Sequence, residues 1–378
     1  MGLFTVATDY NPDAYGLSLA DESIVISTRD VDGSVREAKK YHTRKRQIDG
    51  VITVGTDASM TVAAVANALD LPGIKFINAE AASNKLKMRA RLKECAVPCP
   101  DFFECWTETE AINNYRHLGL QTVVIKPTDN MGARGVSRAT TESEVREAFH
   151  FAKEASPTGE VIIEGFMAGP ELSIDALVYD GEVHISGIAD RIIDYPPFFI
   201  ETGHIMPTNL PQHQIDDAIS IMRQGIKALG INIGAAKGDI KITENGAMVG
   251  EIAARLSGGF MSAYTYPYAT GVDLIGNAIR IALGLPPENM APQFNRVSME
   301  SAIIPGEGLI TAISGIEQAL DIPGVRHVFM NVDVGDTISM PRSNVEKAGH
   351  IIAEAESREQ VIAITRLAQQ NIQFKLSN

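Results

Sequence analysis

The segment Gly238–Phe260, which reads GDIKITENGAMVGEIAARLSGGF, constrains the fold of this chain more than any other. Apolar and polar residues alternate on both sides of the dipeptide Asn245-Gly246, and this combination is the strongest short-range signal for a β-hairpin. We therefore predict two antiparallel strands, 239–243 and 247–253, joined by a turn at 244–246.

The predicted hairpin places charged side chains on one of its surfaces. Side chains alternate between the two faces of a strand, so Asp239 shares a face with Lys241. By the same alternation, Glu251 points to the same side as Ala253 and Arg255. We expect one surface to gather two carboxylates and a guanidinium.

These residue types are the ones that a magnesium–phosphate centre needs. Carboxylate oxygens bind a hard cation, and an arginine stabilises a phosphoryl group in transfer. Gly258 and Gly259 follow, and glycines let a loop bring its backbone N–H groups close to an anion. A solvated surface hairpin would carry the same charges, so the rest of the chain has to decide between the two interpretations.

Length and composition limit the class of protein. A chain of 378 residues with 45% hydrophobic and 21% charged residues is expected to form two or three globular domains. The chain lacks a run of about 18 apolar residues that could span a bilayer, and it lacks a basic-then-apolar signal peptide. We therefore expect a cytoplasmic protein without a membrane partner.

Charge and cysteine content argue against two further kinds of site. A net charge of −14 opposes binding to a polyanion, so no nucleic-acid partner is expected. Cys95, Cys99 and Cys105 lack the second ligand pair of a zinc knuckle, and we expect them to be reduced thiols.

The first 82 residues alternate short apolar runs with helical patterns, which favours a small parallel α/β layer. The predicted elements are strands at 3–8, 23–28 and 50–55, the start of another strand at 71–76, and helices at 34–46 and 57–70. The chain begins at the edge of its first visible strand.

The middle of the chain carries several polar groups between regular elements. The predicted elements are a basic helix at 84–95, strands at 122–127, 160–166, 171–179 and 182–190, and helices at 141–155 and 212–229. The loop 129–136 contains Gly132 and Gly135 but lacks the Gly-Lys-Ser/Thr of a Walker loop. Residues 188–210 are rich in proline and aromatic residues, so we expect no regular element around Glu201-x-x-His204.

The last part of the chain reads as a separate α+β lobe. A helix at 270–283 ends at Gly284 and two prolines, and strands at 299–304, 325–333 and 348–355 and a helix at 357–370 follow. Residues 291–378 show no clustered catalytic residue types. We expect this lobe to bury the centre of the molecule or to close a substrate pocket.

In order and spacing, these segments resemble the ATP-grasp superfamily, most closely its carboxylate–amine ligase branch, which includes L-amino-acid ligases and is related to carbamoyl-phosphate synthetase and biotin carboxylase. The resemblance implies an α/β and α+β ATP-grasp fold with a truncated-looking N-terminal domain. N-terminal domains of this family usually begin with a glycine-rich strand and helix ahead of the strand seen here at 3–8, so we expect either that this protein lacks them or that its true start lies upstream of Met1. The implied domains are an N-terminal α/β domain at 1–82, a nucleotide-binding and catalytic region at 83–290, and a C-terminal lobe at 291–378.

The resemblance also implies roles for individual residues. Lys85 in the NK-x-x-MR pattern and Lys126 in VVIKP would contact ATP phosphates, and the loop with Gly132 and Gly135 would close over them. In the EGF-x-x-G-x-E-x-S-x-D pattern, Glu164 and Glu171, with Phe166 beside them, would hold adenine and ribose. Asp239 and Glu251 would bind Mg²⁺, with Mn²⁺ as the alternative ion, and Arg255 would steady an acyl phosphate.

Substrate residues follow from the same resemblance. Glu201 would meet the ammonium of an amino acid and His204 the intermediate, while Ser257, Gly258 and Gly259 would meet the carboxyl end. Ala253 stands where the Glu-x-Asn-x-Arg pattern has its asparagine, so an amide oxygen that often assists the metal is missing.

The implied reaction is ATP-dependent activation of a carboxylate, followed by attack of an amine to give an amide and ADP. Two alternatives stay open, namely activation of bicarbonate or formate, and a regulatory protein that binds ATP without turnover. The aromatic residues at Phe198-Phe199 and Tyr264–Tyr268 favour an organic substrate over bicarbonate. The expected partners are a small-molecule carboxylate and amine, and a homodimer is compatible with the sequence.

Overall fold

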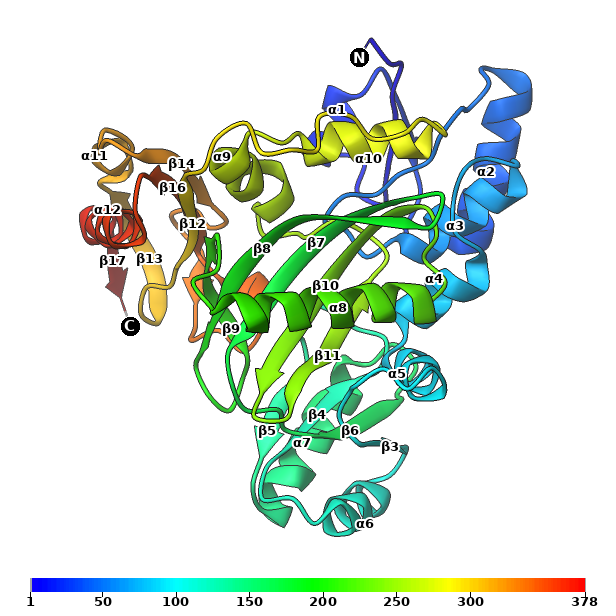
Figure 1. The fold of residues 1–378 in the computed structure, drawn as a ribbon. Coiled ribbons are helices and arrows are strands. Elements are labelled where there is room, and N and C mark those ends of the chain that lie inside the picture. The colour runs from blue at the N-terminus through cyan, green and yellow to red at the C-terminus, as the bar shows by residue number, and fades with distance from the viewer. Residues whose placement is uncertain (1, 378) are drawn as a thin grey trace.

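A large antiparallel sheet forms the centre of the computed structural model, which describes residues 2–377 (Figure 1). Both predicted strands of the hairpin belong to it, at one edge of the sheet. Its eight strands are, in spatial order, β11 (Gly246–Ala253), β10 (Gly234–Thr243), β7 (Glu171–Tyr179), β8 (Glu182–Asp194), β9 (Ile200–Met206), β12 (Val297–Ile303), β16 (Gly349–Ala355) and β14 (Val325–Met330).

One face of this sheet is covered by a long amphipathic helix, α8 (Gln212–Ala228) (Figure 1). The apolar side of α8 includes Ile221, Met222 and Ile226 and packs on residues of β10 and β11 such as Ile240 and Val249. Because side chains alternate in a strand, this packing directs Lys237, Asp239 and Lys241 to the opposite face.

A second antiparallel sheet, smaller than the first, lies below it in the view of Figure 1. Its strands, in spatial order, are β3 (Phe102–Cys105), β6 (Val161–Gly165), β4 (Val123–Pro127) and β5 (Ser137–Ala139). Helices α6 (Glu108–Leu118) and α7 (Glu142–Ala155) pack on it through residues such as Ile112 and Phe149. Both helices begin at a threonine whose side chain accepts a hydrogen bond from the third helical residue.

The N-terminal region is only partly as predicted. The structure has two parallel strands, β1 (Val6–Asp9) and β2 (Glu22–Val25), and the helices α1 (Tyr15–Leu19), α2 (Val31–Arg44), α3 (Ser59–Ala68) and α4 (Phe76–Ser83). The strands predicted at 50–55 and 71–76 were wrong. Residues 50–55 make a single bridge, between Val54 and Leu256, and residues 71–75 are an irregular segment before α4. An apolar run becomes a strand only where another strand pairs with it.

The region 188–210 is regular, contrary to the prediction. It contains the end of β8 and the whole of β9, which pair antiparallel and contribute the middle of the large sheet. The prolines lie outside these strands, at 196 and 197 between them and at 207 after them. Proline disfavours strand pairing only at its own position, so the flanking residues remain free to pair.

The C-terminal lobe shares the large sheet with the centre of the molecule. β12 pairs with β9, and β16 and β14 extend the sheet further, so the sheet continues across the boundary proposed at residue 290. The rest of the lobe is a three-stranded sheet with two helices and a short 3₁₀ turn: β13 (Gly308–Ser314), β15 (Thr337–Ile338), β17 (Gln373–Ser377), α11 (Ile316–Leu320), α12 (Arg358–Asn371) and η2 (Asn344–Glu346).

Three further segments follow the hairpin, and a fourth precedes the small sheet. η1 (Met261–Thr265), α9 (Tyr266–Thr270) and α10 (Leu274–Ala282) pack on β7 and β8 through residues such as Tyr266 and Leu274. The predicted basic helix is α5 (Lys85–Glu94), which is capped by Asn84.

Within residues 2–377, none of the helices has the length and apolar character needed to cross a membrane.

Candidate active site

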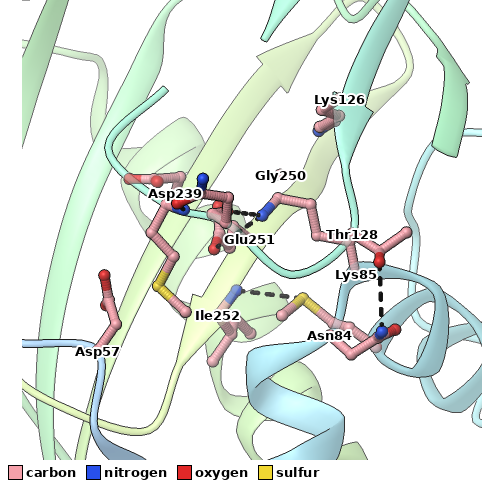
Figure 2. Close-up of polar contacts among 12 residues, drawn as sticks. Asp57, Asn84, Lys85, Lys126, Thr128, Asp239, Gly250, Glu251 and Ile252 are labelled. Atoms are coloured by element: carbon pink, nitrogen blue, oxygen red, sulfur yellow. Dashed lines mark hydrogen bonds and ion pairs between the residues drawn. The ribbon is translucent and has the colours of Figure 1, made fainter. Parts of the chain in front are cut away.

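A β-bulge at Gly250 brings Asp239 and Glu251 together. In the β10–β11 register, Asp239 lies opposite Glu251 and Ile240 lies opposite Val249, so Gly250 is the extra residue. Without the bulge, strict alternation would place Glu251 opposite Gly238, on the face that packs against α8. Figure 2 shows the two carboxylates close together on the neighbouring strands.

A buried arginine contacts the bulge. Arg89 of α5 is fully buried, and its Nη2 donates a hydrogen bond of 2.6 Å to the carbonyl oxygen of Gly250. Its Nε donates to Oε1 of Glu164, also at 2.6 Å. A side chain at position 250 would bring a Cβ atom within 2.9 Å of the Asp239 carbonyl oxygen, so a glycine suits this position.

A cavity lies between the two sheets, and the carboxylate pair lines one part of it. Apolar side chains line another part, among them Val124, Val136, Phe166, Ile193 and Phe199. The charged lining residues are Lys85, Lys126, Glu164, Glu171, Arg191, Asp239, Lys241 and Glu251. An apolar slot that continues into a charged pocket can take a planar base at one end and phosphates at the other.

Two lysines point their ammonium groups at this charged part (Figure 2). Lys85 Nζ donates to the Asn130 carbonyl at 2.7 Å and lies 3.8 Å from Glu251 Oε1. Lys126 Nζ lies 2.5 Å from Glu164 Oε2. Burial by itself would raise the pKa of Glu251, but Lys85, Lys237 and Lys126 outweigh it and lower this pKa to about 2. Glu251 is therefore ionised at neutral pH.

Arg191 of β8 contacts three carboxylates, and we call these four residues the Arg191 cluster. Its guanidinium pairs with Glu171 and Glu201 and lies 3.3 Å from Asp239 Oδ2. Burial would raise the pKa of Glu201, yet the charge of Arg191, with those of Lys347 and Lys237, holds it well below its usual value. The cluster connects Glu171, the candidate ribose contact, with Asp239, a candidate metal ligand, and Glu201, a candidate substrate contact.

Lys237 adds another cation beside the carboxylate pair. It lies directly across from Ala253 in the strand register, and its ammonium group pairs with Asp239. The position where the ATP-grasp pattern has an asparagine therefore faces a lysine in this chain.

The two loop glycines have different surroundings. Gly132 has a φ of +66° and lines the cavity, where backbone N–H groups can reach a phosphate. Gly135 has a φ of +72°, and a Cβ atom there would lie 2.5 Å from the Ala155 side chain. Gly135 thus allows close packing of the loop against α7.

Arg255 and the residues after it are fixed by contacts outside the cavity. Arg255 Nε donates to Asp57 Oδ1 of the N-terminal region at 2.7 Å. Ser257 donates from its backbone N at 2.9 Å and from its hydroxyl at 2.5 Å to the carboxylate of Asp175. Gly259 has a φ of +58° and open space around its Cα atom.

The aromatic residues that favoured an organic substrate lie in two different places. Phe199 lines the cavity next to Phe166, with ring centroids 6.4 Å apart. Tyr264 packs instead with Phe260 and with Phe329 of the C-terminal lobe. Phe199 therefore lies in the apolar part of the cavity, whereas Tyr264 packs against the C-terminal lobe.

Two family models match the chain. Residues 120–263 match the ATP-grasp domain, and residues 302–377 match L-amino acid ligase C-terminal domain 2. Residues 120–263 are an ATP-grasp domain. These matches confirm the predicted ATP-grasp fold and the assignment to the ATP-dependent ligases.

Known proteins resemble this chain over nearly its whole length. Uncharacterized protein y4rH of Sinorhizobium fredii is 27% identical over 358 residues, which cover 93% of this chain and 73% of that protein. The L-amino acid ligase from Bacillus licheniformis has a TM-score of 0.81 at 23% identity, covering 95% of this chain and 88% of that one. A third similar structure is the biotin carboxylase domain dimer of Hydrogenobacter thermophilus 2-oxoglutarate carboxylase, solved in complex with MgADP, ADP and bicarbonate. It has a TM-score of 0.73 at 20% identity, and the match covers 100% of this chain and 86% of that one.

The carboxylate pair of this ATP-grasp domain suits magnesium. Within residues 2–377, no group of three or more His, Cys, Asp or Glu side chains is arranged to hold a metal ion. Mg²⁺ in nucleotide sites commonly takes one or two carboxylates and completes its shell with phosphate oxygens and waters. Asp239 and Glu251, directly opposite each other in the sheet, fit that pattern.

Sequence reasoning missed several residues of the site. Arg89 and Arg191 were not identified because the carboxylates that they contact lie far from them in the chain. The C-terminal lobe also contributes. Asn344 accepts a hydrogen bond from the Glu201 backbone at 2.8 Å and donates its own N–H to Gly132 at 2.9 Å, while Lys347 Nζ donates to the Glu201 carbonyl at 3.1 Å.

Proposed function

We propose that this protein is an ATP-dependent carboxylate–amine ligase that forms an amide or peptide bond through an acyl phosphate. The carboxylate would come from an amino acid or a similar small metabolite. The observation that carries the proposal is the Gly250 bulge, since it places Asp239 and Glu251 opposite each other in a cavity that two lysines also line. A solvated surface hairpin would not need this arrangement.

Each part of the cavity corresponds to a part of the reaction. The apolar side chains, with Phe166 and Phe199, would hold the adenine, and Glu171 would meet the ribose. Lys85, Lys126 and the backbone of the Gly132 loop would bind the phosphates. Glu164 pairs with both Arg89 and Lys126, so we assign it to placing Lys126 rather than to the nucleotide base.

Asp239 and Glu251 would hold Mg²⁺, which when bound neutralises phosphate charge. The protein would then position the substrate carboxylate in line with the terminal phosphate, and Arg255 would stabilise the charge of the acyl phosphate. Asp57 orients Arg255, so the N-terminal region would take part in forming the site. The reaction needs no nucleophile from the protein.

The proposal is tested by ATP-dependent phosphate release, screened over amino acids and dicarboxylic metabolites, singly and in pairs. Release that requires both a carboxylate and an amine, with an amide as product, is the expected result. The Asp239→Asn variant serves as a control for contaminating phosphatases and should release no phosphate above background. Tight ATP binding without release for any pair would refute the ligase and favour a regulatory ATP-binding protein.

The same screen separates the bicarbonate alternative. The biotin carboxylase structure similar to this chain contains bicarbonate, so bicarbonate and formate belong among the test substrates. Phosphate release with bicarbonate alone, and none with any amino acid, would replace the proposed substrate class. The cytoplasmic location and the homodimer stay predictions, which fractionation and light scattering can test.

A further inference from the structure

A buried cluster of one carboxylate and two imidazoles lies beside Glu201. His204 of β9, Glu300 of β12 and His350 of β16 form it, and we call it the Glu300 cluster. These strands are neighbours in the large sheet, and Glu300 lies directly opposite His204 in the register. The three residues are almost completely buried, with exposed fractions of 4% for His204, 0% for Glu300 and 5% for His350.

The contacts in the cluster define which imidazole nitrogens carry hydrogen. Glu300 Oε2 lies 2.9 Å from His204 Nδ1, and Oε1 lies 2.5 Å from His350 Nδ1. Burial would raise the pKa of Glu300, but the two histidine hydrogen bonds help to lower it to about 2. An ionised carboxylate only accepts hydrogen bonds, so both Nδ1 atoms are donors. In a neutral His204, Nε2 is then the nitrogen with a free lone pair.

His204 Nε2 points toward Glu201. The Nε2 atom lies 3.9 Å from Glu201 Oε2, which is longer than a hydrogen bond. The other carboxylate oxygen of Glu201 pairs with Arg191. An ammonium group bound at Oε2 of Glu201 would therefore lie beside a nitrogen that can accept a proton.

Other charged groups surround His204 on the neighbouring elements. Arg191 lies opposite it on β8, and Lys347 lowers the pKa values of both Glu201 and Glu300. His204 thus lies near two carboxylates, Glu201 and Glu300, and directly opposite Arg191 in the strand register. A proton added to its imidazole would face one buried carboxylate directly, through Nδ1.

We propose that His204 accepts the proton of the attacking amine at Glu201 and that Glu300 and His350 are positioning residues for it. The inference rests on the proposed ligase function. The amine arrives as an ammonium, one N–H bond breaks, and the proton goes to His204 Nε2. The electron pair freed on nitrogen forms the C–N bond with the acyl phosphate carbon. The C–O bond to phosphate then breaks, its electron pair leaves with the phosphate, and the second proton lost by the nitrogen goes to that phosphate, which departs as hydrogen phosphate.

This assignment gives the C-terminal lobe a role in the reaction. Glu300 keeps Nδ1 protonated, so that Nε2 faces Glu201, and it compensates the imidazolium charge. His350 holds the second oxygen of Glu300 and so prevents the carboxylate from rotating away from His204. A purely structural cluster would stabilise the sheet in the same way but would not act selectively on the amine step.

The experiment compares two nucleophiles. Hydroxylamine is largely unprotonated at neutral pH, so its attack on an acyl phosphate does not need a protein base, whereas an amino-acid ammonium does. For His204→Asn, we expect the ratio of amide formation to hydroxamate formation to fall by about 100-fold or more. The asparagine amide can still donate to Glu300, so this variant keeps the cluster hydrogen bond while losing Nε2.

Glu300→Gln tests the positioning residue, and the readout is the pH profile of amide formation. Without the compensating carboxylate, His204 is less basic, so the acidic limb of the profile should move to lower pH. Glu354→Gln is the matched control, since Glu354 is a buried carboxylate of β16 that pairs with Arg296 and Arg326 instead of histidines. This control should keep both the nucleophile ratio and the pH profile of the native protein.

The outcomes separate the inference from the proposed function. A native protein that forms neither amide nor hydroxamate with any carboxylate refutes both. If the native protein is active and His204→Asn lowers both products equally or neither, the proton-acceptor role is overturned. If Glu300→Gln fails to fold, the His204→Asn variant still decides whether the His204 imidazole accepts the proton. The His350→Asn variant then takes the place of Glu300→Gln in the pH-profile experiment.

Discussion

The Arg191 cluster and the Glu300 cluster are both buried groups of charged side chains in the same sheet, yet they are built from different chemistry. The first surrounds one guanidinium with three carboxylates, and the second surrounds one carboxylate with two imidazoles. A guanidinium keeps its charge at every pH at which a protein is folded, whereas an imidazole exchanges its proton near neutral pH.

The difference suits the two steps of the proposed reaction. Carboxylate activation requires a constant electrostatic field around phosphates, and a fixed positive charge among the carboxylates provides one. Attack by the amine requires a group that gains and loses a proton in each cycle. The two clusters meet at Glu201, which pairs with Arg191 and faces His204.

The largest effect is expected from Arg191→Met. This change would leave Glu171, Glu201 and Asp239 without their shared cation in a buried site, and breaking a buried pair costs about 3–5 kcal/mol. The free energy of unfolding, measured with urea, should fall by that amount. Arg296→Met removes a partly exposed partner of Glu354 and should cost about 1 kcal/mol or less. Equal losses in the two variants would contradict the special position of Arg191.

Arg255→Ala should affect rate rather than nucleotide binding. Its proposed partner is the acyl phosphate, which forms only after ATP is bound, so turnover should fall by about 100-fold or more. The dissociation constant for ATP, measured by calorimetry, should stay close to that of the native protein. An unaltered rate would remove Arg255 from the reaction. Asp57→Asn should cause a smaller loss of rate, because it alters only the orientation of Arg255.

Lys126→Ala should weaken ATP binding by about 10-fold, because one hydrogen bond to a charged group contributes about 1.5–3 kcal/mol. Calorimetric titration with ATP measures this change in the dissociation constant. Lys153→Ala, on α7, is the control, since its ammonium contacts the Trp106 carbonyl away from the cavity. Equal affinities for Lys126→Ala and the native protein would exclude Lys126 from the phosphate site.

Local patterns in the sequence were sufficient to predict the hairpin, α5, α7, α8 and the strand that carries Lys126, because each has its own periodicity or cap. Asp239 and Glu251 were also predicted to lie on one surface, but the argument from alternation was incomplete. Alternation gives the face of each side chain within its own strand and does not say whether Asp239 and Glu251 lie on the same face of the sheet. They share a face only because of the bulge at Gly250. A bulge depends on pairing between strands, so a single sequence does not show it.

The Glu300 cluster could not be predicted from patterns in the sequence. Its three side chains come from strands that are far apart in the sequence and become neighbours only in the sheet. One signal was present, since Glu300 is a charged residue inside the apolar run of β12, and such a residue is rarely buried without a partner. That signal indicates a partner without identifying it.

The smallest effect, the acid dependence of stability, sharpens the comparison of the two clusters. Glu300 has a pKa of about 2 in the folded protein against 4.5 for a free glutamate, so the unfolded chain binds its proton first. The stability that Glu300 contributes is therefore present above pH 4.5 and is lost as the pH falls toward 2. His204, His350 and Lys347 are the cationic or titratable groups that lower this pKa.

In Glu300→Gln, the free energy of unfolding should change less steeply with pH between pH 4.5 and pH 2 than in the native protein, by on the order of 1 kcal/mol. Urea unfolding at a series of acidic pH values measures the slope, and an identical slope in both proteins would show that the histidines do not hold Glu300 ionised.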